Sequence, residues 1–269
     1  MEIRVENILP VSSYLPVQEK PLIIAGPCSA ESEEQVLDTA RELAKIRQVA
    51  AFRCGLWKPR SRPGDFEGIG EEALKWLKKA KRETGLKMAV EVAIPKHIEL
   101  CLKYEIDILW IGSRTVVNPF AVHEIVEALK GVDVAVLVKN PVNPDLPLWI
   151  GALERLSQHG IKKLAAVHRG FSAYKSGPYR NLPLWEIPIE LRRLIPGLPV
   201  LVDPSHISGR KEMIGEVAQD AMNLAFDGLM IETHIRPEEA LTDSRQQISP
   251  EAFKTLISAL NITNNNQPG

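Results

Sequence analysis

Residues 198–234 read LPVLVDPSHISGRKEMIGEVAQDAMNLAFDGLMIETH, and they contain two apolar runs separated by one amphipathic segment. In the middle segment, Lys211–Ala225, apolar residues recur at steps of three and four, which predicts a helix with one buried stripe. The flanking runs, Leu198–Ser205 and Gly228–His234, are mostly apolar and β-branched, as is typical of parallel strands covered on both faces. The stretch therefore predicts a strand–helix–strand unit of a parallel sheet.

The same alternation extends back to Leu22 and predicts an α/β protein. Six further strands are predicted at Leu22–Cys28, Val49–Gly55, Lys87–Val92, Ile108–Gly112, Val134–Asn140 and Lys163–Arg169. Eight strands, with helices such as Glu71–Arg82 between them, match the size of a (β/α)8 TIM barrel of about 250 residues. A doubly wound open sheet is the alternative, but the first turn, Gly26-Pro27-Cys28-Ser29, lacks the glycine patterns of nucleotide-binding loops.

The domain prediction divides the chain into three parts. Residues 22–260 form the barrel, residues 1–21 are an N-terminal extension that could add a small β-element at the barrel bottom, and residues 261–269 are a polar tail or linker.

Composition excludes several classes of protein. Lys and Arg number 33 and Asp and Glu number 34, so the net charge of −1 gives no sign of a nucleic-acid binder or a membrane-surface protein. The chain has three cysteines, which is an odd number, and it is long enough to fold without disulfide bonds. This favours a reducing compartment. No apolar run approaches the roughly 20 residues of a membrane span, and the start, MEIRVENILP, lacks the blocks of a signal peptide. We expect a cytoplasmic protein without a cleaved leader.

Charged side chains recur where the predicted strands end, which is the reactive face of a parallel barrel. The cationic members are Arg53, Lys58, Arg60, Arg114, Lys139 and Arg169. Any one of them could be an ordinary surface cation, but six together predict a basic cavity for phosphate and carboxylate groups.

A second group at the strand ends is softer and acidic, and it consists of Cys28, His206, Glu232 and Asp243. A thiolate, an imidazole and two carboxylates suit one divalent transition ion, Mn, Fe, Co or Zn, better than Mg. The spacing is too open for a local metal motif, and singly each residue could be structural. Other cysteines and histidines are expected to be buried (Cys54, Cys101), supporting (His168, His234) or on the surface (His97, His123, His159).

An ordered set of short motifs resembles one enzyme family. The motifs are Gly26-Pro27-Cys28-Ser29, Lys58-Pro59-Arg60-Ser61, Ile111-Gly112-Ser113-Arg114, Val138-Lys139-Asn140-Pro141, His168-Arg169-Gly170-Phe171, Asp203-Pro204-Ser205-His206 and Ile231-Glu232-Thr233-His234. Together they resemble the type I 3-deoxy-7-phosphoheptulonate (DAHP) synthases, in the β branch, over about Leu22 to Leu260.

The resemblance implies an aldol-like condensation of phosphoenolpyruvate with erythrose 4-phosphate, which gives DAHP and phosphate at the entry to the shikimate pathway. It implies metal ligands at Cys28, His206, Glu232 and Asp243. The implied phosphoenolpyruvate contacts are Arg53, Lys58, Arg114, Lys139 and Arg169, and the implied erythrose 4-phosphate contacts are Arg60 and Ser61 in the Lys58-Pro59 loop. Glu91 would position water, Asp203 would orient the site, and Lys58 would protonate the new alkoxide.

Two alternatives remain open at this point. The related 3-deoxy-octulosonate 8-phosphate synthases use arabinose 5-phosphate, but they carry Lys-Ala-Asn-Arg where this sequence has Lys58-Pro59-Arg60-Ser61. A non-catalytic phosphate-binding barrel is the other alternative.

Ser113 departs from the family, in which Ala is usual before the Arg. The resemblance also implies a homodimer or homotetramer, and the polar tail is compatible with a missing C-terminal chorismate mutase domain.

Overall fold

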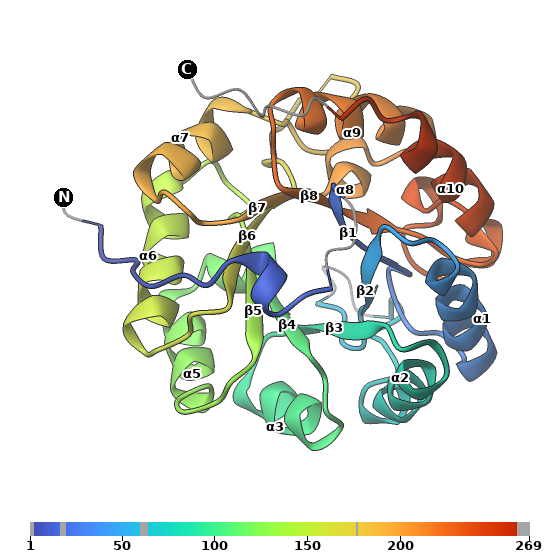
Figure 1. Cartoon of the computed structure of the whole chain (residues 1–269), viewed down its shortest axis with the longest axis horizontal. Coiled ribbons are helices and arrows are strands. Elements are labelled where there is room, and N and C mark those ends of the chain that lie inside the picture. Colours follow the sequence, from blue (N-terminus) through green and yellow to red (C-terminus); the bar gives the residue numbers. More distant parts are fainter. Residues whose placement is uncertain (1–2, 17–19, 60–63, 176, 263–269) are drawn as a thin grey trace.

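The eight predicted strands close into one parallel barrel. The computed structural model describes residues 3–16, 20–59, 64–175 and 177–262. Its strands are hydrogen-bonded in sequence order, and the last pairs with the first (Figure 1). Their bounds are β1 Leu22–Gly26, β2 Val49–Cys54, β3 Lys87–Val92, β4 Ile108–Ile111, β5 Ala135–Lys139, β6 Leu164–His168, β7 Val200–Val202 and β8 Gly228–Glu232. The TIM barrel prediction is confirmed, and the open-sheet alternative is wrong.

Helices surround the barrel and cover the outer faces of the strands (Figure 1). Their bounds are α1 Glu33–Ala44, α2 Glu71–Thr84, α3 Pro95–Lys103, α4 Ser113–Val116, α5 Pro119–Ala128, α6 Leu146–Gln158, α7 Glu186–Leu194, α8 Pro204–Ser208, α9 Ile214–Asn223 and α10 Pro250–Ala259. Local signals fix their ends: the Ser32 side chain caps α1, and Gly85, in the left-handed conformation, ends α2. Among the described residues, no helix has the length and apolar character that crossing a membrane requires.

Alternation along each strand divides the apolar residues between two cores. On β1, Ile23 packs in the layer between strands and helices, whereas Ile24 points into the barrel. The barrel interior is filled by the indole ring of Trp110 and by smaller side chains such as those of Leu137 and Met230. All three residues are buried. The barrel is therefore a packed core, and functional groups are confined to its ends.

The N-terminal segment covers the amino-terminal end of the barrel (Figure 1), and its described residues 3–16 form no strand, unlike the β-element that was expected there. Its described residues form a short 3-10 helix, η1 (Val11–Ser13), followed by Tyr14 and the buried Leu15 (Figure 1). Val11, Tyr14 and Leu15 pack against the interior cluster. Burial of these side chains attaches the segment, so no strand pairing is needed there.

Candidate active site

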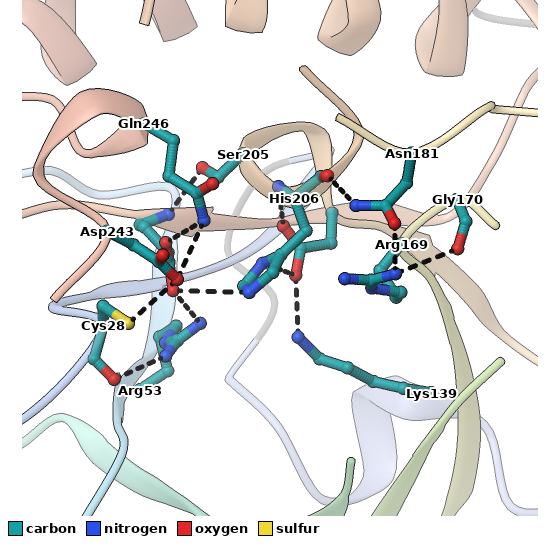
Figure 2. Close-up of polar contacts among 12 residues, drawn as sticks. Cys28, Arg53, Lys139, Arg169, Gly170, Asn181, Ser205, His206, Asp243 and Gln246 are labelled. Carbon is teal, nitrogen blue, oxygen red and sulfur yellow. Dashed lines mark hydrogen bonds and ion pairs between the residues drawn. The ribbon is translucent and has the colours of Figure 1, made fainter. Parts of the chain in front are cut away.

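The predicted site residues that the structure describes gather at the carboxyl ends of the strands. A cavity of about 140 Å³ lies there, and it is lined by Lys58, Pro59, Glu91, Gly112, Ser113, Arg114, Lys139, Val142, Arg169, Ser172, Arg180, His206 and Asp243. In the close-up, Cys28, Arg53, Asp243 and Gln246 lie on one side of His206, and Arg169 with Asn181 lies on the other (Figure 2). The site therefore has an acidic, sulfur-containing side and a cationic side.

The acidic side brings three of the four predicted metal ligands together. One donor atom from each of Cys28, Glu232 and Asp243 lies within 4.8 Å of the others. His206 borders this group, with its Nε2 atom 3.8 Å from Glu232 Oε1. Residues far apart in the sequence meet here because β1 and β8 are neighbours in the closed barrel.

Each member of this cluster contacts its own cation. Lys58 Nζ lies 3.0 Å from Cys28 Sγ, and Arg53 Nη1 lies 3.2 Å from Glu232 Oε1. The third pair joins Asp243 Oδ1 to Arg180 Nη1 at 3.0 Å. Burying charges is costly unless they are paired, so these contacts let the cluster exist inside the protein.

Electrostatics keep the two carboxylates ionised and the sulfur protonated. Burial, helped by nearby Glu232, raises the pKa of the Cys28 thiol to about 12, and the thiol lies 3.5 Å from Asp243 Oδ2. Burial by itself would raise the pKa of Glu232, but His206 and Arg53 lower it below its ordinary value. The pKa of Asp243 is likewise lowered, against burial, by His206 and Arg180.

The cluster fits a divalent transition ion. Glu232 Oε1 is fully buried and accepts no hydrogen bond from the described residues, although it forms an ion pair with Arg53 Nη1 at 3.2 Å, so this oxygen keeps a lone pair for a metal ion. Sulfur, imidazole nitrogen and carboxylate oxygen donors together favour Mn, Fe, Co or Zn over Mg. A bound cation would also favour the Cys28 thiolate over the thiol.

Asp203 fixes the orientation of His206. The carboxylate atom Asp203 Oδ2 lies 2.8 Å from His206 Nδ1 and 2.8 Å from Lys139 Nζ, and Oδ1 accepts the backbone N–H of His206. Burial would raise the pKa of Asp203, but His206 and Lys139 hold it well below its ordinary range. With Nδ1 directed at Asp203, Nε2 faces Glu232 and the cluster, as in carboxylate–histidine–metal arrangements.

The cationic side is held by neutral oxygens. Arg114 donates to the carbonyl of Pro59 at 2.9 Å, and Arg169 donates to Asn181 Oδ1 at 2.7 Å. Burial lowers the pKa of Arg169 to about 10, which still leaves the guanidinium charged at neutral pH. Lys58, Arg114, Lys139, Arg169 and Arg180 therefore present positive charge to one small cavity.

Arg53 has different surroundings from those of the cavity cations. Arg53 does not line the cavity: it is fully buried behind it, where it pairs with Glu232 and donates to the carbonyl of Cys28. Arg60 and Ser61 lie outside the described residues. Pro59 contributes its carbonyl to Arg114, and the Ser113 hydroxyl is buried in the cavity wall, without a hydrogen bond among the described residues.

Glu91 requires the glycine beside it. A Cβ at Gly112 would lie 2.0 Å from Glu91 Oε1, so the glycine makes room for the carboxylate at the cavity wall. His97, which was predicted to lie on the surface, is half-buried, and its ring stacks on Trp57 with centroids 3.9 Å apart. Cys54 and Cys101 are buried, and His123 is exposed.

Sequence reasoning missed four polar residues of the site: Arg180, Asn181, Gln246 and Gln247. Asn181 connects the two sides, because it accepts from Arg169 and donates to the carbonyl of His206 at 2.6 Å. Arg180 and Asn181 precede α7 in the long loop after β6, so their place beyond a strand end was a usable signal. The two glutamines follow Asp243 without any recognisable pattern.

The chain resembles several characterised enzymes. A sequence model of the DAHP synthetase I family matches residues 16–266. A phospho-2-dehydro-3-deoxyheptonate aldolase of Thermotoga maritima is 29% identical over 238 residues, which is 88% of this chain and 68% of the relative. A 2-dehydro-3-deoxyphosphooctonate aldolase of Wolinella succinogenes is 26% identical over 275 residues, covering 89% of this chain and 97% of that protein.

Solved structures agree with the sequence matches. The crystal structure of the Thermotoga maritima DAHP synthase superposes with a TM-score of 0.78 at 30% identity, over 88% of this chain and 66% of that one. A truncated form of 3-deoxy-D-arabino-heptulosonate 7-phosphate synthase from Thermotoga maritima gives a TM-score of 0.76 at 28% identity, covering 88% of this chain and 83% of the other. This chain thus spans about two thirds of the full-length crystallised relative. The chain belongs to the DAHP synthetase I family.

Proposed function

We propose that this chain is a metal-dependent DAHP synthase that condenses phosphoenolpyruvate with erythrose 4-phosphate and releases phosphate, the first step of the shikimate pathway. The observation that carries the proposal is the contact between a Cys28–Glu232–Asp243 cluster and a cavity surrounded by five cations. Such a cavity suits two phosphorylated substrates, one of which also carries a carboxylate. In this proposal the protein is a cytoplasmic homodimer or homotetramer, and its catalytic barrel comprises residues 22–260.

The cationic side binds phosphoenolpyruvate in this proposal. Arg114, Lys139 and Arg169 contact its phosphate and carboxylate, and the Ser113 hydroxyl, which is free of partners among the described residues, adds a donor. Arg53 acts from behind, by holding Glu232 and the carbonyl of Cys28. Arg60 and Ser61 would contact the phosphate of erythrose 4-phosphate.

Cys28, His206, Glu232 and Asp243 would hold one divalent ion, Mn, Fe, Co or Zn. When bound, this ion supplies Lewis-acid polarisation of the aldehyde carbonyl. Asp203 keeps His206 oriented for that task through the 2.8 Å contact at Nδ1.

Lys58 is the proposed proton donor. Burial alone would lower the pKa of its ammonium, but Cys28, Glu91 and Glu232 outweigh burial and raise this pKa above its ordinary value. The group therefore stays protonated beside the cluster. Carbon 3 of phosphoenolpyruvate forms a bond to the aldehyde carbon, and the carbonyl oxygen takes a proton from Lys58 as charge develops on it. Water then adds at carbon 2, in a position set by Glu91, and the proton that it loses restores the Lys58 ammonium. The bond between carbon 2 and the phosphate oxygen breaks as the new hydroxyl at carbon 2 becomes the ketone, and its proton leaves with the phosphate.

The experiment that tests this function measures phosphate release from phosphoenolpyruvate with added Mn²⁺ and either erythrose 4-phosphate or arabinose 5-phosphate. We expect kcat/KM to be at least about tenfold higher with erythrose 4-phosphate, since a site built for one sugar phosphate binds its transition state better. A preference for arabinose 5-phosphate would assign the chain to the octulosonate activity of relatives such as the Wolinella succinogenes enzyme. Absence of phosphate release with both sugars would indicate a non-catalytic barrel.

A further inference from the structure

Two adjacent glutamines lie beside the acidic cluster, and the mechanism above does not use them. Gln246 ends the short 3-10 helix η4 (Ser244–Gln246), and Gln247 follows it. Both side chains are buried, with 1% and 0% exposure. A buried amide needs partners for its donors and acceptor, so the identity of those partners indicates its task.

The Gln246 side chain contacts three charged groups. Its Nε2 atom donates to Glu232 Oε2 at 2.6 Å and to Asp243 Oδ2 at 3.5 Å. Its Oε1 atom accepts from Arg180 Nη1 at 2.5 Å. An ionised carboxylate only accepts and a guanidinium only donates, so both neighbours require the same orientation of the amide.

The backbone that carries Gln246 is attached to the ends of β8 and β1. Ile248 N donates to the carbonyl of Glu232 at 3.2 Å, and the Gln246 N–H donates to the carbonyl of Asp243 at 3.0 Å. The Gln247 side chain accepts from the N–H of Cys28 at 2.9 Å and donates to the carbonyl of Thr242 at 2.8 Å. Gln246 therefore approaches the carboxylates from a fixed base.

The two glutamines differ in what they bind. Gln247 bonds only to backbone groups among the contacts of the described residues, which is what a structural amide does. The Gln246 side chain, among the described residues, bonds only to charged side chains, two of which are proposed metal ligands. Its amide donates a hydrogen bond to Glu232 Oε2, while Oε1 of the same carboxylate accepts no hydrogen bond among the described residues.

We propose that Gln246 is a positioning residue that holds the carboxylates of Glu232 and Asp243 in the arrangement needed to bind the metal ion. It donates to Oε2 of Glu232 and so leaves Oε1, which lies 3.8 Å from His206 Nε2 and 3.2 Å from Arg53 Nη1, as the oxygen for the metal ion. Arg180, bonded to both Asp243 and Gln246, keeps the three side chains together. Loss of such an outer contact weakens metal binding by about 10- to 100-fold in known sites. The inference rests on the metal site of the proposed function.

The test compares metal-depleted wild-type protein with Gln246→Met, which keeps the length of the side chain and removes the amide. Co²⁺ is titrated against a competing chelator, and absorption spectra record the thiolate-to-cobalt charge-transfer band and the d–d bands. We expect the Kd for Co²⁺ to rise by about 10- to 100-fold in the variant, with altered d–d bands. The matched control is Gln219→Met, because the Gln219 amide bonds to both backbone groups of Asn261 away from the site.

Wild-type affinity and an unchanged spectrum in a folded Gln246→Met protein would overturn the proposal. If circular dichroism shows that this variant does not fold, Gln246→Asn, which retains the amide but is one methylene shorter, takes its place with the same expected result. Failure of wild-type protein to give a thiolate–cobalt band would overturn the metal site itself, and with it this role of Gln246. The two failures are thus distinguishable.

Discussion

Charged residues at the barrel mouth are buried as pairs of opposite sign. Lys139 with Asp203 and Arg53 with Glu232 are both nearly inaccessible to solvent. Removing one partner of such a pair leaves an uncompensated buried charge, which typically costs about 3–5 kcal/mol. Functional residues of this site therefore also bear on stability, and an inactive variant needs a check of its folding.

Single residues differ in how far the sequence could predict them. Lys139 and Glu232 end apolar strands, so the strand pattern alone puts their side chains at the mouth. Arg180 and Gln246 lie in loops, and their contacts depend on a backbone path that no short-range pattern specifies. Gln246 reaches Glu232 only because the chain after β8 returns to pair Ile248 with the end of that strand.

His168 gives a prediction about acid stability at the scale of one residue. Its ring is buried against Phe171 and Trp185, and burial lowers its pKa from 6.5 to about 3. The folded protein keeps the ring neutral while the unfolded chain takes up a proton as the pH falls below 6.5. Its contribution to the free energy of unfolding is therefore complete above that pH and falls by up to about 1.4 kcal/mol per pH unit below it.

Urea unfolding of wild type and His168→Met between about pH 6.5 and 4.5 measures this contribution. We expect a shallower loss of stability with falling pH in the variant, whatever its stability at neutral pH. His123→Met, at an exposed position, is the control for replacing a histidine with methionine, and it is measured in the same way. Equal slopes in wild type and His168→Met would show that His168 is not held neutral.

Strand positions were predictable from the sequence, but several strand ends were not. The run Leu198–Ser205 predicts one long strand, whereas β7 covers only Val200–Val202. The strand stops because Asp203 caps α8 and Pro204 occupies its first turn. That change directs Asp203 and His206 into the site from a helix start. The described residues of the N-terminal segment form no strand, and buried side chains attach them to the barrel.

The ends of β1 and β2 are closely packed at Gly26, and this packing predicts the effect of adding a side chain there. Gly26, the last residue of β1, has φ +151°, and a Cβ there would lie 2.1 Å from the carbonyl oxygen of Arg53. Backbone atoms cannot give way as a flexible side chain does, so Gly26→Ala should lower the free energy of unfolding by about 1–3 kcal/mol. Urea unfolding monitored by circular dichroism measures the change.

Gly215 is the matched control for this substitution. It lies in the first turn of α9 with open space around its Cα, so Gly215→Ala should raise stability by up to about 1 kcal/mol. A Gly26→Ala protein as stable as wild type would mean that the ends of β1 and β2 are less closely packed than described.

The whole molecule has a nearly neutral charge that conceals an uneven distribution. The formal net charge is −1, yet five cations face one cavity at the carboxyl ends of the strands. Closure of the barrel explains why the sequence could predict this concentration, because it brings every strand end to the same face. Closure does not specify the path of the loops that complete the site, and that is why the contacts of Arg180, Asn181 and Gln246 were not predicted.

The central claim is that the two sides of this mouth act together, with a divalent ion on the acidic side and phosphorylated substrates on the cationic side. The most direct measurement is the rate of phosphate release from phosphoenolpyruvate and erythrose 4-phosphate by metal-depleted protein, before and after titration with Mn²⁺, Fe²⁺, Co²⁺ or Zn²⁺. We predict no turnover without metal, recovery with at least one of these ions, and no recovery in folded Cys28→Ala or His206→Ala proteins. Full activity in the metal-depleted wild-type protein would contradict the account.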